Sequence, residues 1–187
     1  MKEEDWNLSF EKLVMETKKS IEKFSAEHND EIISYINYDT DPIYGYVLVS
    51  YNTLEHSNEF TRKQHDYNLS YIRERIEKPS WQKYALERLK SRSFVPHCDS
   101  PGDFKYMGYS EIKFPDWESF SRSEKPSEAE ESNTAYLDRN VSMLLWRAMD
   151  KLAETDAFNN LKLSSPTLLG FNIHDSAPVV TRMLNLP

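Results

Sequence analysis

His97, Cys98 and Asp99 stand side by side and carry an imidazole, a thiol and a carboxylate, the groups that nucleophilic catalysis combines. Neighbouring residues of an extended segment point to opposite sides, and catalytic triads are assembled from residues distant in the sequence. The tripeptide alone therefore does not make a triad. A catalytic site would need a further partner, for example His174 or Asp175 at the end of a predicted strand.

Motifs for binding metals and nucleotides are missing from the sequence. The 5 histidines include no pair at i, i+4 spacing, so a zinc site would have to be assembled from distant loops. The 4 glycines are too widely spaced for a P-loop or a dinucleotide fingerprint. Cys98 is the only cysteine, which leaves no internal disulfide and no thiolate cluster. We predict no metal, no cofactor and no enzymatic activity.

Acidic and aromatic side chains alternate between residues 99 and 120, a mixture that is typical of protein interfaces. Tyr and Trp are favoured anchors there, and surrounding acids select a basic partner and accelerate its association. The alternative interpretation is a loop whose aromatic rings fold back onto the core. On the first interpretation, the candidate partner-binding residues are Asp99, Asp103, Tyr106, Tyr109, Glu111, Asp116, Trp117 and Glu118.

The net charge of −8 opposes broad binding to nucleic-acid backbones. Residues 62–92 differ, with 9 basic and 4 acidic side chains and several aromatic rings. Because these charges interleave on predicted helices, we interpret the segment as solvated helix surface and predict no direct nucleic-acid binding. No apolar run approaches the roughly 18 residues that span a bilayer, and the first residues lack a secretory signal. We therefore expect a cytoplasmic protein without membrane association.

Hydrophobic periodicity and β-branched runs predict the elements of the first half of the chain. A turn signal at Asp39–Pro42 separates two runs that we expect to pair as strands. The predicted elements are a helix at 6–27, strands at 32–38 and 43–51, and helices at 53–77 and 81–89.

Proline and glycine punctuate residues 94–126, which predicts an irregular excursion with one short strand near residues 106–114. A capping box of Ser127 and Glu130 predicts the start of the central core helix. We expect its buried stripe to be widened by Met143, Trp146 and Met149. A buried strand at 167–173 follows, and Ser176 is expected to cap a short terminal helix with Pro178 in its first turn.

Length and element order predict a single domain over residues 1–187. The fold class is α/β (α+β), with a small, mostly antiparallel sheet packed against several helices.

The order of elements resembles the bacterial domain-of-unknown-function family four-three-zero-three over most of the chain. The best matching positions are the strand end Tyr51-Asn-Thr53, the aromatic Trp81, and the strand Ile173-His-Asp175 with the terminal Leu-Asn. Such families tend to be encoded beside secreted polymorphic or contact-dependent toxins, where small acidic cytoplasmic proteins act as immunity proteins. The resemblance transfers no binding residue, because immunity surfaces vary with the toxin that they meet.

We therefore expect a cytoplasmic immunity protein that binds the C-terminal domain of a cognate, nuclease-type secreted toxin and occludes it sterically. Toxins that cut nucleic acid must be cationic to hold phosphates, so an acidic antagonist with aromatic anchors complements them. One alternative is an enzyme with a site near His97, Cys98 and His174. Another is an interaction protein without a toxin partner.

Overall fold

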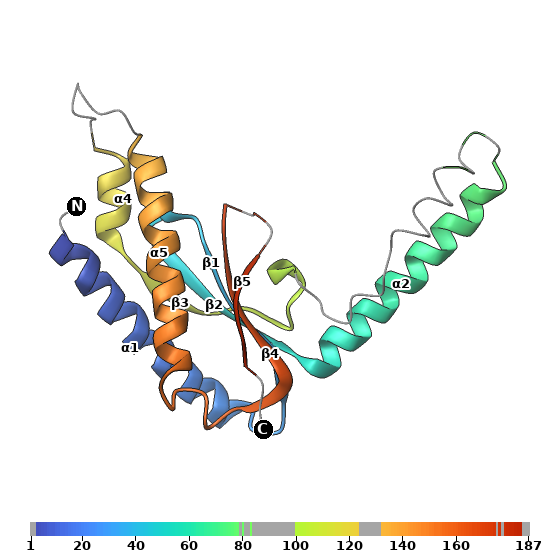
Figure 1. Ribbon diagram of the computed structural model, residues 1–187, viewed down its shortest axis with the longest axis horizontal. Coiled ribbons are helices and arrows are strands. Elements are labelled where there is room, and N and C mark those ends of the chain that lie inside the picture. The colour runs from blue at the N-terminus through green and yellow to red at the C-terminus, as the bar shows by residue number, and fades with distance from the viewer. Residues whose placement is uncertain are drawn as a thin grey trace.

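A five-stranded mixed sheet forms the centre of the computed structural model, which describes residues 3–78, 80, 83, 100–123, 132–174, 176 and 178–184 (Figure 1). The strand order is β3-β2-β1-β4-β5. The central β1–β4 pair is parallel and the other three pairs are antiparallel. The strands are β1 (Ile32–Thr40), β2 (Tyr46–Thr53), β3 (Tyr106–Lys113), β4 (Lys162–Ile173) and β5 (Val179–Leu184). This confirms the predicted α+β class and the mostly antiparallel sheet.

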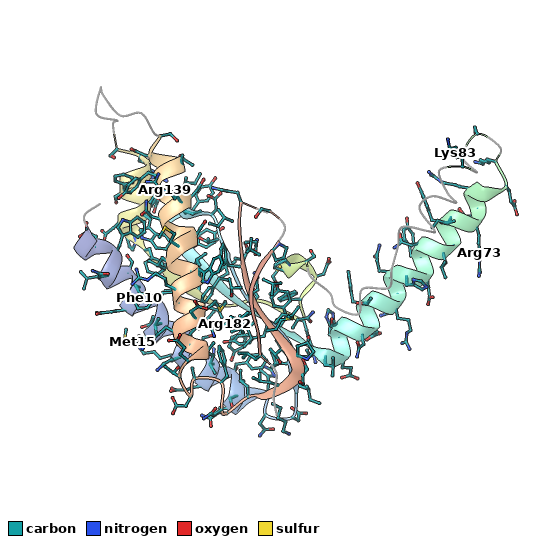
Figure 2. The ribbon with its side chains drawn as sticks, in the orientation of Figure 1. Phe10, Met15, Arg73, Lys83, Arg139 and Arg182 are labelled. Carbon is teal, nitrogen blue, oxygen red and sulfur yellow. The ribbon has the colours of Figure 1, made fainter. Side chains whose placement is uncertain are left out.

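Helices α1, α4 and α5 lie together on one face of the sheet, and α2 projects away from it as an arm (Figure 1). The helices are α1 (Glu3–Glu27), α2 (Leu54–Ile76), α4 (Pro115–Ser121) and α5 (Asn133–Ala153), with short 3₁₀ turns η1 (Pro42–Tyr44) and η2 (Pro101–Asp103). Arg73 and Lys83, from the basic segment, lie far out along this arm (Figure 2). None of the described helices is long and apolar enough to cross a membrane.

The main core lies between α1, α5 and the sheet. The predicted stripe of α1 is buried there through Leu13, Ile21 and Phe24. Thr17 also lies in this stripe because its hydroxyl meets the Tyr38 phenol at 2.8 Å, inside the core. A buried hydroxyl needs such a partner, so polar residues at these positions are compatible with burial. The opposite face of the sheet carries a smaller cluster around Tyr35 and Phe104.

The central helix begins later than predicted. Its N-cap is Ser132, whose hydroxyl accepts a hydrogen bond from the Ala135 backbone amide at 3.0 Å. Ser127 and Glu130 lie outside the described residues. The predicted stripe is confirmed from Val141 to Leu152, but Met143 and Trp146 are exposed rather than buried.

The predicted terminal helix is wrong. Residues Val179–Leu184 form strand β5, antiparallel to β4, instead of a helix capped by Ser176. Two β-branched residues after Pro178 favour an extended backbone, and the neighbouring β4 supplies the hydrogen bonds that a short helix would have made internally. Of the helix predicted at 81–89, only Lys83 is described, and it is helical.

Candidate functional site

Three chain junctions meet at one end of the sheet. Antiparallel pairing sets Ile33 opposite Thr53, so the turn that follows α1 lies beside the first turn of α2. Strand β3 starts at the same end, because Tyr106 pairs with Tyr51. Between these segments lies a hollow of about 390 Å³, here named the acidic groove. It is lined by Asp30, Glu31, Ile32, Thr53, Leu54, Glu55, Asn58 and Lys105.

Local sequence signals fix the walls of the acidic groove. Helix α1 ends with a hydrogen bond from the His28 amide to the Phe24 carbonyl, and the Glu31 amide closes the following turn on His28. Helix α2 begins directly after β2, because the Thr53 hydroxyl accepts the His56 amide at 3.1 Å as an N-cap. The groove walls are therefore held by the hydrogen-bonded turn after α1 and by the capped start of α2.

The acidic groove carries more negative than positive charge. Among its lining residues, Asp30, Glu31 and Glu55 are acidic and Lys105 is the single base. The Lys105 ammonium lies 2.7 and 2.8 Å from the two carboxylate oxygens of Glu31. Asp30 and Glu55 are exposed and, among the described residues, form no ion pair. They are therefore free to meet a cation from outside.

Protonation of Glu31 is governed by its neighbours. Partial burial alone would raise the pKa of Glu31, but hydrogen bonds from Lys105 and Tyr106 outweigh it and lower that pKa. The same contact with Glu31 raises the pKa of Lys105. Both shifts hold the charged forms at neutral pH, so this pair is suited to presenting fixed charge rather than to transferring protons.

Two tyrosines connect the acidic groove to the core. The rings of Tyr106 and Tyr109 each pack edge-on against Phe24, at 5.1 Å between centroids. The Tyr106 hydroxyl donates to Glu31, and the Tyr109 hydroxyl donates to Glu27 at 2.5 Å. Desolvation first, and these carboxylates second, raise the pKa of both phenols. Each phenol therefore stays neutral and acts as a hydrogen-bond donor that orients an acid.

The structure does not bring the eight predicted partner-binding residues together. Tyr106 and Tyr109 lie beside the acidic groove, whereas Glu111, Asp116 and Glu118 lie toward the opposite end of β3 or on α4. Glu111 is only two residues from Tyr109, but Tyr106 and the α4 acids Asp116 and Glu118 lie at or beyond opposite ends of a strand that spans about 23 Å.

The remaining members of that set are also dispersed. Trp117 is fully buried and stacks on Phe114 at 4.1 Å, so it is part of the core and not an exposed anchor. Glu118 pairs with Arg122 at 2.7 Å. Asp103 is exposed on η2, and Asp99 lies outside the described residues.

His174, the histidine of the enzyme alternative, bridges two acids. Its Nδ1 lies 2.9 Å from Asp41 and its Nε2 lies 2.8 Å from Asp138, which belongs to α5. Only a protonated imidazole can donate from both nitrogens. Desolvation opposes that charge, but the two carboxylates outweigh it and raise the pKa of His174. His97, Cys98 and Asp175 lie outside the described residues.

We expect His174→Gln to reduce stability most at acidic pH. A pKa that is raised on folding adds stability below the ordinary histidine value of about 6.5, and this stability disappears as pH rises through the folded pKa. Urea unfolding at several pH values should therefore show a difference from wild type near pH 6 that shrinks by pH 9. In an Asp41→Asn/Asp138→Asn background the difference should lose its pH dependence. If wild type and His174→Gln differed in stability by the same amount at every pH, His174 would not form ion pairs with Asp41 and Asp138.

Within the described residues, no three His, Cys, Asp or Glu side chains come together in a way that could hold a metal ion. No protein family model, curated protein sequence or solved structure matches this chain.

Proposed function

We propose that this chain is a cytoplasmic immunity-type protein that binds a basic, nuclease-type toxin domain and blocks it sterically. The observation that carries the proposal is the acidic groove, where Asp30 and Glu55 present carboxylates without a basic partner among the described residues. A nuclease holds phosphates with Lys and Arg, and these side chains match carboxylates in a recess.

Two further features support occlusion. The groove continues along α2, since a second hollow is lined by Glu55, Asn58, Glu59 and Arg62. The acids therefore extend from the body of the protein onto the projecting arm α2 (Figure 1). The pKa shifts of Glu31 and Lys105 keep their charges fixed, which suits electrostatic recognition.

The first experiment is to search the adjacent reading frames for a secreted protein with a basic C-terminal domain and to co-express that domain with this chain. A stable complex and rescue of growth are expected. If the two proteins do not associate and growth is not rescued, the proposal is wrong.

The second experiment places the contact. Asp30→Lys combined with Glu55→Lys should weaken binding of that domain by about 100-fold, because like charges would face each other in the recess. The matched control is Glu11→Lys combined with Glu22→Lys, two exposed positions on α1 that change the net charge by the same amount. Calorimetric titration of both variants separates local contact from long-range attraction. If both double variants weakened binding equally, the acidic groove would not be part of the interface.

A further inference from the structure

Strand β5 is an open edge of the sheet. It pairs with β4 on one side, and no strand among the described residues pairs with its other side. The backbone N–H and C=O groups on that side are therefore available to another strand. Proteins usually protect such edges with charges, proline or a covering segment.

Among the described residues, β5 itself carries no proline and no unpaired charge that would protect its open edge. Its one charged residue, Arg182, is directed to α5, where its Nε lies 2.5 Å from Asp150 and its Nη2 lies 3.7 Å from Glu154 (Figure 2). The other five residues of the strand are Val179, Val180, Thr181, Met183 and Leu184, none of which carries a charge.

Apolar side chains lie on both faces of this edge. Val179 pairs with Phe171 of the main core, so it lies on the face that carries α5. Met183 pairs with Leu168, which packs against the smaller cluster on the opposite face. An occupant of the edge must therefore offer a strand backbone with apolar residues on both of its faces.

Helix α5 extends the apolar surface on one side of the strand. Trp146 lies on one i, i+4 row between Asp138, which contacts His174, and Asp150, which contacts Arg182. Trp146 therefore lies on the flank of α5 that faces the β4–β5 hairpin. Met143 is three residues before it and is also exposed. Together with three residues of the strand they form a surface here named the β5 patch: Met143, Trp146, Val179, Val180 and Met183. The exposed fraction of each of these side chains is between 45% and 63%.

A hollow continues the β5 patch past the end of the strand. It has a volume of about 560 Å³, and its lining includes the apolar residues Phe158, Leu163, Met183 and Leu184 together with the polar Thr155 and Asn159. Antiparallel pairing with a full-length strand would bring the start of that strand to this hollow. The available surface is thus longer than the six residues of β5.

We infer that β5 pairs antiparallel with β5 of a second copy of this chain across a two-fold axis, which joins two five-stranded sheets into one. A second copy meets each requirement of the edge, because its β5 is uncharged except for an Arg182 that its own α5 already neutralises. The two-fold axis places apolar residues against apolar residues, as an isologous interface requires. The same axis brings Trp146 of both copies to the joint, where tryptophan is a favoured anchor.

The test is the mass of the full-length protein in solution, measured by sedimentation equilibrium over a range of concentrations. Wild type should form a dimer of twice 22.1 kDa. Met183→Lys should weaken dimerisation by about 100-fold, because it places a charge in an apolar joint where the facing strand offers no carboxylate to pair with it. Met15→Lys is the matched control, since Met15 is 50% exposed on α1, away from β5 (Figure 2). A wild-type monomer at every concentration, or equal effects of the two variants, would overturn the inference.

Cross-linking keeps the inference testable if Met183→Lys does not fold. In a Cys98→Ser background, Val180→Cys or Thr181→Cys should form a disulfide-linked dimer on mild oxidation, because residues near the axis face their own mates. Met15→Cys should not. A dimer that cross-links at neither β5 position would show that another surface joins the copies. Dimerisation does not depend on the acidic groove. The dimer inference can therefore be wrong while the proposed toxin binding is right, and toxin binding can be wrong while the dimer is right.

Discussion

Trp117→Ala is expected to lower the free energy of unfolding by about 3–5 kcal/mol, the cost of removing a large aromatic side chain from a core. Trp117 is fully buried, stacks on Phe114, and lies 6.0 Å from the ring of Trp6. Truncation would leave a cavity between α4, α1 and the sheet. Urea unfolding followed by far-ultraviolet circular dichroism measures the loss.

The matched control is Trp146→Ala, because Trp146 is half exposed on α5. Measured where the protein is monomeric, its effect should be within about 0.5 kcal/mol of zero. Trp117→Phe should cost less than Trp117→Ala, since it keeps a ring against Phe114 and removes an indole N–H that, among the described groups, has no hydrogen-bond partner. If Trp117→Ala left stability unchanged but weakened toxin binding, Trp117 would be the exposed anchor that the sequence pattern suggested.

The contrast between these two tryptophans shows where sequence patterns were sufficient. Long periodic segments predicted α1, α2 and α5, because a stripe at spacings of three and four can be buried only by a helix. The same reasoning failed at the margins of the stripe. Trp146 was expected to widen the buried stripe, but it is half exposed on the flank of α5 that faces the edge strand β5.

Pairing between distant segments was harder to predict. The hairpin of β1 and β2 was visible because its turn is local, at Asp39–Pro42. The parallel pairing of β1 with β4 joins residues about 130 positions apart, for example Asn37 and Gly170, and no local signal specifies it.

The acidic groove was missed for the same physical reason. Asp30, Glu55 and Lys105 come from three separate stretches and meet only because strand register aligns the start of β1, the end of β2 and the start of β3. Interleaved acids and tyrosines between residues 99 and 120 made Tyr106 and Tyr109 candidates for partner binding, which stays a prediction. The acids that those tyrosines orient, Glu27 and Glu31, come from the end of α1 and the turn after it, far earlier in the chain.

Substituting alanine at each of the 4 glycines should separate two causes of destabilisation that usually occur together. Gly45 combines both, because its φ is +64° and an added Cβ would lie 2.5 Å from the Phe114 carbonyl oxygen. Gly108 has a φ of +59° but an added Cβ would find its nearest neighbour at 3.6 Å. Gly170 lacks the positive φ, but an added Cβ would lie 2.6 Å from the Tyr35 hydroxyl and 2.8 Å from the Val179 carbonyl oxygen.

The expected losses in unfolding free energy follow from these contacts. Gly108→Ala should cost about 1–2 kcal/mol for the left-handed backbone, and Gly170→Ala about 1–3 kcal/mol for overpacking. Gly45→Ala should cost about the sum of the two, roughly 2–5 kcal/mol. Gly102→Ala is the control, with an effect within about 0.5 kcal/mol of zero, since its added Cβ would find its nearest neighbour at 4.0 Å.

The series also tests the placement of β5 in the sheet. The clash at Gly170 involves the carbonyl of Val179, so Tyr35→Phe should recover only part of the stability lost in Gly170→Ala, because it relieves the hydroxyl contact and leaves the strand contact. Full recovery would mean that β5 does not lie against Gly170, and the edge on which dimerisation depends would then be elsewhere. Partial recovery of stability, together with weaker dimerisation of Gly170→Ala, would show that close packing of β5 against β4 is needed to shape the edge that dimerises.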